Sequence, residues 1–121
     1  MVELAKRRCV ACEGGLPKVA GRELAALRRE LDPNWEVDRG TKLRRAFAFD
    51  DFAGALRLAN EIGALAEKEW HHPDLELGWG RVVVSIQTHA VGGLTMNDFV
   101  LAAKIDRLVA RRGTRKGRRR A

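Results

Sequence analysis

The stretch from Phe52 to Trp70 constrains the fold more than any other part of the sequence, because its apolar residues keep a helical period throughout. Spacings of three and four residues place them on one face of an α-helix. Asp50 precedes the pattern as a suitable N-cap, and Pro73 stops the helix from continuing beyond it. The sequence therefore predicts a long amphipathic helix that needs an apolar surface to pack against. Its apolar positions are Phe52, Ala55, Leu56, Ala59, Ile62, Leu65 and Ala66.

Two pairs of strand patterns flank this helix. Residues 35–38 and 43–49 precede it, and residues 75–79 and 81–89 follow it. Alternation of polar and apolar residues and a high content of β-branched residues favour strands, and the short glycine-containing connections favour antiparallel hairpins. In the last strand the alternation assigns His89 to the more polar face.

Two further helical patterns complete the domain. Residues 21–31 form one apolar stripe that ends before Pro33. After Gly92 and Gly93 the chain has Thr95 and Asp98 three residues apart, which resembles a capping box and predicts the start of a final helix. The order helix, two strands, helix, two strands, helix predicts an α+β fold, with a four-stranded antiparallel sheet and three helices packed on one face.

Charge is distributed unevenly along the chain. The net charge is +7, and seven of the 23 Lys and Arg residues lie between Arg111 and Arg120. We expect an N-terminal extension over residues 1–19, one domain over residues 20–110 and a disordered basic tail over residues 111–121. The tail is either a solvated extension or a segment that binds nucleic acid without sequence readout.

The compartment follows from two absent patterns. No apolar run reaches the roughly 20 residues that a membrane span needs, and the first residues lack the apolar core of a secretory signal. We therefore expect a cytoplasmic protein that does not contact a membrane.

Cys9 and Cys12 form a Cys-x-x-Cys motif. A structural zinc site needs four ligands, and no second cysteine pair or nearby histidine completes one. A redox motif would open a helix, whereas Gly14, Gly15 and Pro17 follow here. We interpret the motif as a surface segment with two thiols.

All three histidines lie close together in the sequence, at His71, His72 and His89. Histidine is the usual general acid or base near neutral pH. The end of the preceding helix favours the protonated form of His71, and Glu67, four residues earlier, is placed to hydrogen-bond its ring. Two alternatives stay open: a metal site, which adjacent histidines with diverging side chains disfavour, and a surface without chemistry.

The histidines lie within a longer motif. The segments Glu67–Leu75 and Thr88–Asp98, with Trp79 between them, closely resemble the signature of the pterin-4a-carbinolamine dehydratases. The shared features are His-His-Pro, the spacing to the third histidine, the Gly-Leu-Thr turn and the aspartate after it. The residues around Cys9 also resemble a bacterial branch of that family.

This resemblance implies dehydration of 4a-hydroxytetrahydrobiopterin (pterin-4a-carbinolamine) to quinonoid dihydropterin, in tetrahydrobiopterin recycling and without a metal or organic cofactor. It assigns acid/base catalysis to two histidines, substrate contact to three residues and supporting roles to two acids. These are His71 and His89 as catalysts, His72, Pro73 and Trp79 as substrate contacts, and Glu67 and Asp98 as orienting residues.

The resemblance also implies partners. An aromatic amino acid hydroxylase would supply the substrate, and the chain would form a homodimer or homotetramer. Leu75 and Trp79 depart from the aromatic residue and the tyrosine of many members, which bears on how the pterin packs. Two other functions remain: a protein-interaction module, as in members that act as dimerisation cofactors of a transcription factor, and a nucleic-acid binder through the tail.

Overall fold

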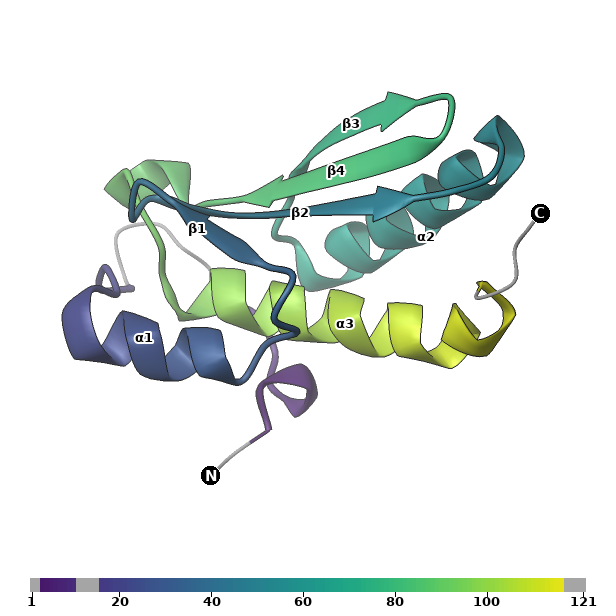
Figure 1. Ribbon diagram of the computed structural model, residues 1–121. Helices are drawn as coiled ribbons and strands as arrows, with labels where there is room; N and C mark the ends of the chain where they lie inside the picture. Colours follow the sequence, from purple (N-terminus) through teal and green to yellow (C-terminus); the bar gives the residue numbers. More distant parts are fainter. Residues whose placement is uncertain (1–2, 11–15, 117–121) are drawn as a thin grey trace.

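The computed structural model describes residues 3–10 and 16–116. It has the predicted α+β architecture, with a four-stranded antiparallel sheet in the order β1-β2-β4-β3 and three helices on one of its faces (Figure 1). Two short 3-10 helices lie outside these elements, at Leu4–Lys6 and His89–Val91. The elements are α1 (Gly21–Arg29), β1 (Glu36–Asp38), β2 (Lys42–Ala48), α2 (Phe52–Glu69), β3 (Asp74–Gly78), β4 (Arg81–Ile86) and α3 (Met96–Lys116).

Helix α2 begins one residue later than the sequence suggested. The N-cap is Asp51, whose side chain accepts a hydrogen bond of 2.8 Å from the Gly54 N–H, so the prediction of Asp50 was wrong. Both aspartates suit the position chemically, and only the backbone geometry distinguishes them. The helix buries only part of the predicted stripe against the sheet, because Phe52 and Leu56 are exposed and Leu58, which was not assigned to the stripe, is buried instead. Its fully buried residues are Ala55, Leu58, Ile62 and Ala66.

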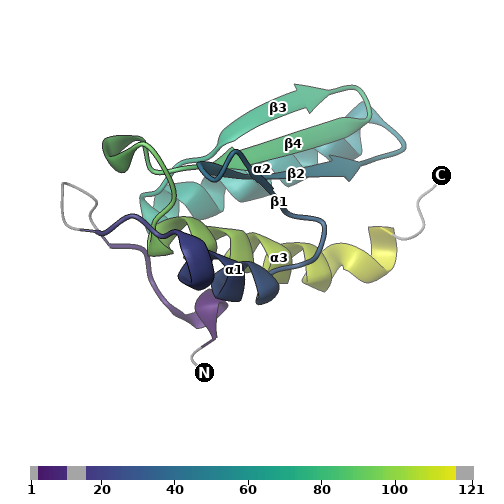
Figure 2. The same cartoon turned by 60° about the vertical axis from the view of Figure 1, so that its left-hand side comes forward.

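The core lies between the sheet and the helices. On β4, Val82, Val84 and Ile86 all have 0% exposure, as the alternation predicted. They pair with the neighbouring strand β2, where Ile86 is opposite Leu43 and Val82 is opposite Phe47. Helix α3 covers this face with a second group of fully or almost fully buried residues (Figures 1 and 2). These are Phe99, Val100, Leu101, Ala102 and Ile105.

An ion pair connects the sheet to α3 within this apolar layer. Arg45 of β2 lies 2.7 Å from a carboxylate oxygen of Asp106, which also accepts a 2.7 Å hydrogen bond from the Trp35 indole N–H. Burial raises the pKa of Asp106, although the hydrogen bonds from Asp32 and Trp35 and the charge of Arg45 oppose that change. A paired charge of this kind fixes how the helix lies on the sheet, because separating the partners would leave one of them buried alone.

Two other predicted boundaries were wrong. Strand β4 ends at Ile86, so His89 does not lie on the strand but begins a 3-10 helix. Helix α3 continues to Lys116, which places residues 111–116 in the helix instead of a disordered tail. Arginine favours helices, and the Gly and Thr that follow do not stop this one. Residues 117–121 lie outside the described part of the chain. Within the described part, no helix is both long and apolar enough to span a membrane.

Candidate active site

The end of α2 positions the first two histidines. Trp70 caps the helix in the left-handed conformation, with φ 55° and ψ 44°. The backbone N–H groups of Trp70 and His71 both donate to the Ala66 carbonyl, a pairing that closes a helix and turns the chain away. His71 therefore follows the helix directly, one residue beyond the last turn in which the sequence placed it.

The turn directs His71 into the protein. Its side chain is only 6% exposed, and its Nε2 atom lies 2.6 Å from Oδ1 of Asp98, which is fully buried in the first turn of α3. The pair joins two residues 27 positions apart in the sequence. A carboxylate that accepts a hydrogen bond from one ring nitrogen fixes the tautomer of the ring and stabilises its protonated form.

Two threonines hold the Asp98 carboxylate. Its Oδ2 atom accepts from the Thr88 hydroxyl at 2.8 Å and from the Thr95 N–H at 2.7 Å. The second bond is half of the predicted capping box. Because the single proton of the Thr88 hydroxyl goes to Asp98, the 2.9 Å contact between the two threonine hydroxyls must be donated by Thr95. A continuous chain of hydrogen bonds therefore runs from Thr95 through Thr88 and Asp98 to His71.

His72 lies at the surface, with its side chain 44% exposed. Its Nε2 atom is 2.6 Å from Oε2 of Glu67, and the Trp70 ring meets it edge to face at 4.8 Å between centroids. The prediction that Glu67 hydrogen-bonds His71 was therefore wrong. The helix ends in a left-handed residue, which swings His71 inward and leaves His72 as the histidine within reach of Glu67.

His89 comes to the site through its neighbour in the chain. Thr88 and Gly93 exchange two backbone hydrogen bonds, of 2.8 and 3.4 Å, which close a small loop around His89. Gly92 has φ 65°, a conformation that suits glycine, at the end of the 3-10 helix in this loop. His89 is exposed at the start of that helix, directly after the threonine that binds Asp98. All three histidines are thus placed by elements that meet at the Asp98 carboxylate.

The structure does not bring every predicted contact residue to this place. Pro73 lies half-buried between His72 and the start of β3. Trp79, 69% exposed, lies in the turn at the other end of β3, about 17 Å further along a five-residue strand. Within one copy of the chain, Trp79 is therefore separated from the histidines. In the described residues, no group of three or more His, Cys, Asp or Glu side chains is arranged to hold a metal ion.

The N-terminal segment fastens the two helix ends that carry the site. The Cys9 N–H donates to Glu69 at the end of α2, and Val10 and Asn97 exchange two hydrogen bonds of 2.9 and 2.7 Å at the start of α3. Cys9 is half-buried, with its thiol 3.6 Å from the Asn97 carbonyl oxygen, so this thiol is less exposed than the predicted surface segment implies. Cys12 lies outside the described residues.

Burial alone would raise the pKa of Glu69, whose side chain is 7% exposed. The hydrogen bond from the Cys9 N–H and the nearby charges of Lys104 and Arg8 outweigh burial and hold this pKa below its usual value. Glu69 is therefore an ionised anchor for the N-terminal segment, two residues before His71.

Sequence reasoning assigned no role to Thr88 or Asn97, and it gave Thr95 a role only in the capping box of the last helix. Each is buried and each hydrogen-bonds the site or its support. Thr88 and Thr95 were visible in the motif around His89, and a threonine next to a candidate catalytic residue is a signal worth following.

A buried aspartate–histidine pair, exposed histidines that follow His71 and Thr88 in the chain, and an antiparallel sheet covered by three helices define a small α+β protein with a candidate acid–base site. Comparisons with known proteins identify the family to which such a protein belongs. The family profile described as "Pterin 4 alpha carbinolamine dehydratase" matches residues 17–108. The chain belongs to this family.

Individual relatives agree with the profile. A protein of Rubrobacter xylanophilus, provisionally named a pterin-4-alpha-carbinolamine dehydratase, is 51% identical over 108 residues, which are 89% of this chain and all of the relative. The crystal structure of a "transcriptional coactivator/pterin dehydratase" from Brucella melitensis superposes with a TM-score of 0.70 at 31% identity, over 76% of this chain and 98% of that one.

A more distant structure shows only the fold. A pterin dehydratase-like protein described as a RuBisCO assembly factor in the α-carboxysome has a TM-score of 0.50 at 23% identity, over 61% of this chain and 84% of that one. The fold therefore also occurs in a protein whose title names an assembly role, and chemistry has to be argued from the site.

Proposed function

We propose that this protein dehydrates 4a-hydroxytetrahydrobiopterin to quinonoid dihydropterin and water by histidine acid/base catalysis. The observation that carries the proposal is the buried pair of His71 and Asp98 at 2.6 Å, supported by Thr88 and Thr95, in a chain of this family. A carboxylate that two threonine residues hold against one imidazole ring is the arrangement by which an aspartate orients a catalytic histidine.

The reaction needs two proton transfers. The C4a hydroxyl leaves as water when it receives a proton, and the ring nitrogen next to that carbon loses its hydrogen, so that the electron pair of the broken N–H bond forms the new double bond. We assign these transfers to His71 and His89, since both steps need groups that titrate near neutrality. Asp98 acts as the positioning residue of His71, because the hydrogen bond between them orients the ring.

His72 and Pro73 are assigned to substrate contact, and Pro73 also holds the backbone of His72 in an extended conformation. Glu67 orients the His72 ring instead of the His71 ring, in keeping with their 2.6 Å contact. The exposed Trp79 lies too far from the histidines of its own chain to share a substrate with them. Its contact role therefore requires that it reach the site of a second copy, in the homodimer or homotetramer that we also propose.

The cellular setting of the proposal is tetrahydrobiopterin recycling in the cytoplasm. An aromatic amino acid hydroxylase would produce the carbinolamine that this enzyme consumes. The seven basic residues between Arg111 and Arg120 would bind nucleic acid only through charge, without recognition of a sequence.

The decisive experiment is turnover of the carbinolamine by histidine variants. His71→Ala and His89→Ala should each lower kcat by about 10²- to 10⁴-fold, the usual loss for a general acid or base. His72→Ala should act mainly on KM. The variant His71→Gln keeps a donor for Asp98 and separates catalysis from folding, which circular dichroism monitors. Unchanged kcat in the folded His71 and His89 variants would refute the mechanism.

A second candidate is a protein-interaction module without essential catalysis. The edge strand β3 exposes Leu75 and Leu77 at 36% and 38%, next to Trp79 in the following turn. Apolar side chains on an unpaired strand edge are suited to another protein. Partner binding that survives loss of His71 and His89, in a protein without measurable turnover, would favour this candidate.

A further inference from the structure

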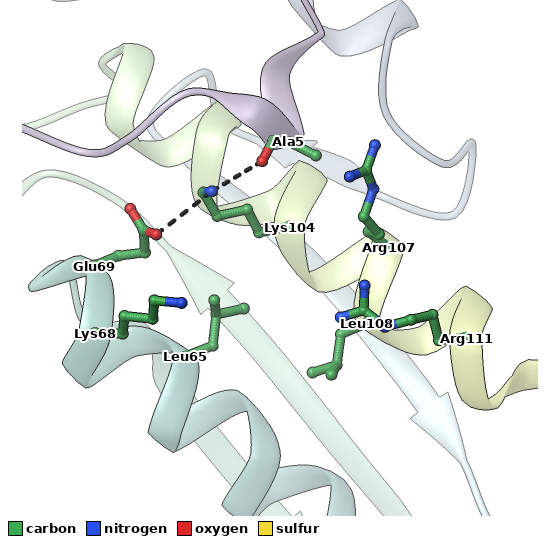
Figure 3. A pocket seen from close by; sticks show the side chains of 8 residues that line it. All are labelled: Ala5, Leu65, Lys68, Glu69, Lys104, Arg107, Leu108 and Arg111. Atoms are coloured by element: carbon green, nitrogen blue, oxygen red, sulfur yellow. Dashed lines mark hydrogen bonds and ion pairs between the residues drawn. The ribbon is translucent and has the colours of Figure 1, made fainter.

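A cleft of about 230 Å³ lies between the C-terminal part of α2 and the middle of α3. Leu65 of α2 and Leu108 of α3 contribute apolar side chains to it, and Ala5 of the N-terminal segment lies at one end (Figure 3). None of the three histidines lines it. Its α3 residues begin at Lys104, six positions and about 9 Å along the helix axis from Asp98. We call it the α2–α3 cleft.

Four of the residues lining the α2–α3 cleft are basic and only Glu69 is acidic. Two of the basic residues already have partners. Lys104 lies 3.4 Å from Glu69 and donates to the Ala5 carbonyl at 2.8 Å, and Arg107 pairs with Glu3 at 2.9 Å. Because the low pKa of Glu69 keeps it ionised, the charge of Lys104 is balanced.

The other two, Lys68 and Arg111, have no carboxylate partner among the described residues. Figure 3 shows both side chains extending from their helices into the space between α2 and α3, beside Leu65 and Leu108. Two like charges directed into one cleft repel each other, and an anion placed between them would relieve that repulsion. The cleft thus combines an unbalanced positive charge with an apolar wall.

We infer that the α2–α3 cleft binds a small organic anion, a carboxylate or phosphate carried on an apolar body. The acidic group lies between Lys68 and Arg111, where arginine offers a planar pair of donors to its oxygens. The apolar body lies against Leu65 and Leu108. The site is separate from the candidate active site and does not depend on the proposed dehydratase activity.

The cleft favours a small ligand over a nucleic acid. Its volume suits one compact group, and no aromatic side chain lines it to stack on a base. A polyanion would contact the basic residues beyond Arg111 and would not need the two leucines. An acidic peptide would place a carboxylate in the cleft but would also need a surface on either side of it.

The test uses the full chain, labelled with ¹⁵N at low ionic strength, and phenyl phosphate as the probe. We expect saturable shifts of the backbone amides of Leu65, Lys68, Leu108 and Arg111, with a Kd in the millimolar range. Inorganic phosphate should bind about tenfold more weakly because it buries no ring. Benzyl alcohol, which keeps the ring and lacks the charge, should not saturate the same amides.

Charge-neutral variants locate the site. Lys68→Gln and Arg111→Gln should each raise the Kd about three- to tenfold. Arg22→Gln and Arg29→Gln on α1 remove the same net charge elsewhere and should change it by less than about twofold. An equal loss in both pairs would mean that net charge alone attracts the probe, and would overturn the inference.

Three other results would also overturn it. One is the absence of saturable shifts with phenyl phosphate at tens of millimolar. Another is a set of shifts centred on His71, His72 and His89, which would mean that the probe uses the candidate active site. The third is tight binding of a mixed-sequence oligonucleotide, or of an acidic peptide, that depends on Lys68 and Arg111 and that phenyl phosphate does not displace.

Discussion

Asp98 is fully buried and accepts hydrogen bonds from three different residues. An unpaired carboxylate in such a place would be very costly, so its partners account for its presence. The bonds from Thr88 and Thr95 hold the carboxylate still, and the remaining oxygen faces His71. At the scale of single residues, the arrangement aims one negative charge at one imidazole ring.

Asp98→Asn tests that arrangement. The amide oxygen can replace the oxygen that meets Thr88 and Thr95, which turns the amide NH₂ toward His71. The ring must then accept on Nε2, so it takes the other tautomer and its protonated form loses a counter-charge. We expect kcat for carbinolamine turnover to fall at least about 10²-fold.

Thr88→Val serves as the matched control for Asp98→Asn. It removes one donor from the carboxylate while keeping the charge, and should lower stability by about 1 kcal/mol with a smaller effect on kcat. A folded Asp98→Asn protein with wild-type kcat would show that Asp98 serves only the fold.

Trp70 carries backbone strain at the same helix end. Its φ of 55° costs an ordinary residue roughly 1–2 kcal/mol, and the side chain recovers little of this because it is 72% exposed. Trp70→Gly removes the strain but adds freedom to the unfolded chain, worth about 0.4–1 kcal/mol. The variant should be more stable by about 0.5–1 kcal/mol in urea unfolding. Trp70→Ala keeps the strain, so equal stabilities of the two variants would contradict this explanation.

At the scale of elements, the site is the meeting place of two helix ends and a loop. The end of α2 supplies His71, the first turn of α3 supplies Asp98, and Cys9 and Val10 fasten both through Glu69 and Asn97. The N-terminal segment is therefore part of what sets the distance between α2 and α3. A substitution that removes one of these hydrogen bonds should therefore alter the site although the substituted residue does not contact the substrate.

Glu69→Gln gives this fastening a pH signature. Because the folded protein lowers the pKa of Glu69 below its usual 4.5, the ionised side chain stabilises the fold. That stabilisation is fully present above the unfolded pKa and is lost as the pH falls through the folded pKa. The variant should be about 1–2 kcal/mol less stable than the wild type at pH 7.

The deficit should begin to shrink as the pH falls below about 4.5 and should vanish once the pH has passed through the lowered pKa of Glu69 in the folded protein, where both proteins carry a neutral side chain. Urea unfolding at several pH values measures it. Glu76→Gln, at an exposed position on β3, is the control and should show little difference at any pH. A deficit in Glu69→Gln that stays constant with pH would mean that shape, not charge, explains the role of this residue.

The elements that the sequence predicted best are those with a clear period. The stripe of α2 was confirmed only in part: Ala55, Ile62 and Ala66 are buried, whereas Phe52 and Leu56 are exposed and the buried Leu58 was not assigned to it. The alternation on β4 correctly placed Val82, Val84 and Ile86 on the core face, because burial on one face leaves a regular pattern. The turn to His71 was not predictable, since it depends on a tryptophan adopting a conformation that tryptophan disfavours. The pairing of Asp98 with His71 joins distant positions, and no local pattern reports such a contact.

At the scale of the whole molecule, the excess of positive charge lies outside the part of the chain that forms the core. The basic excess of the sequence lies in its last eleven residues, which contain seven Lys or Arg and no acid. The apolar residues of α3 that pack against the core end at Leu108 and Val109. Arg111, in the part of α3 that continues beyond these residues, lines the α2–α3 cleft.

Two truncations separate the contributions of these terminal residues. Removing residues 117–121 should leave kcat unchanged and Tm within about 2 °C, because the core contacts of α3 end at Val109.

Removing residues 111–121 also takes away Arg111 and the last helical residues. It should again preserve kcat, since no candidate catalytic residue lies there, but it should lower Tm by a few degrees through fraying of the helix end and weaken phenyl phosphate binding as Arg111→Gln does. Differential scanning fluorimetry and carbinolamine turnover at fixed salt measure both variants. If the shorter truncation alone abolished turnover, the terminal residues would belong to the active site, and the separation of charge from catalysis would be wrong.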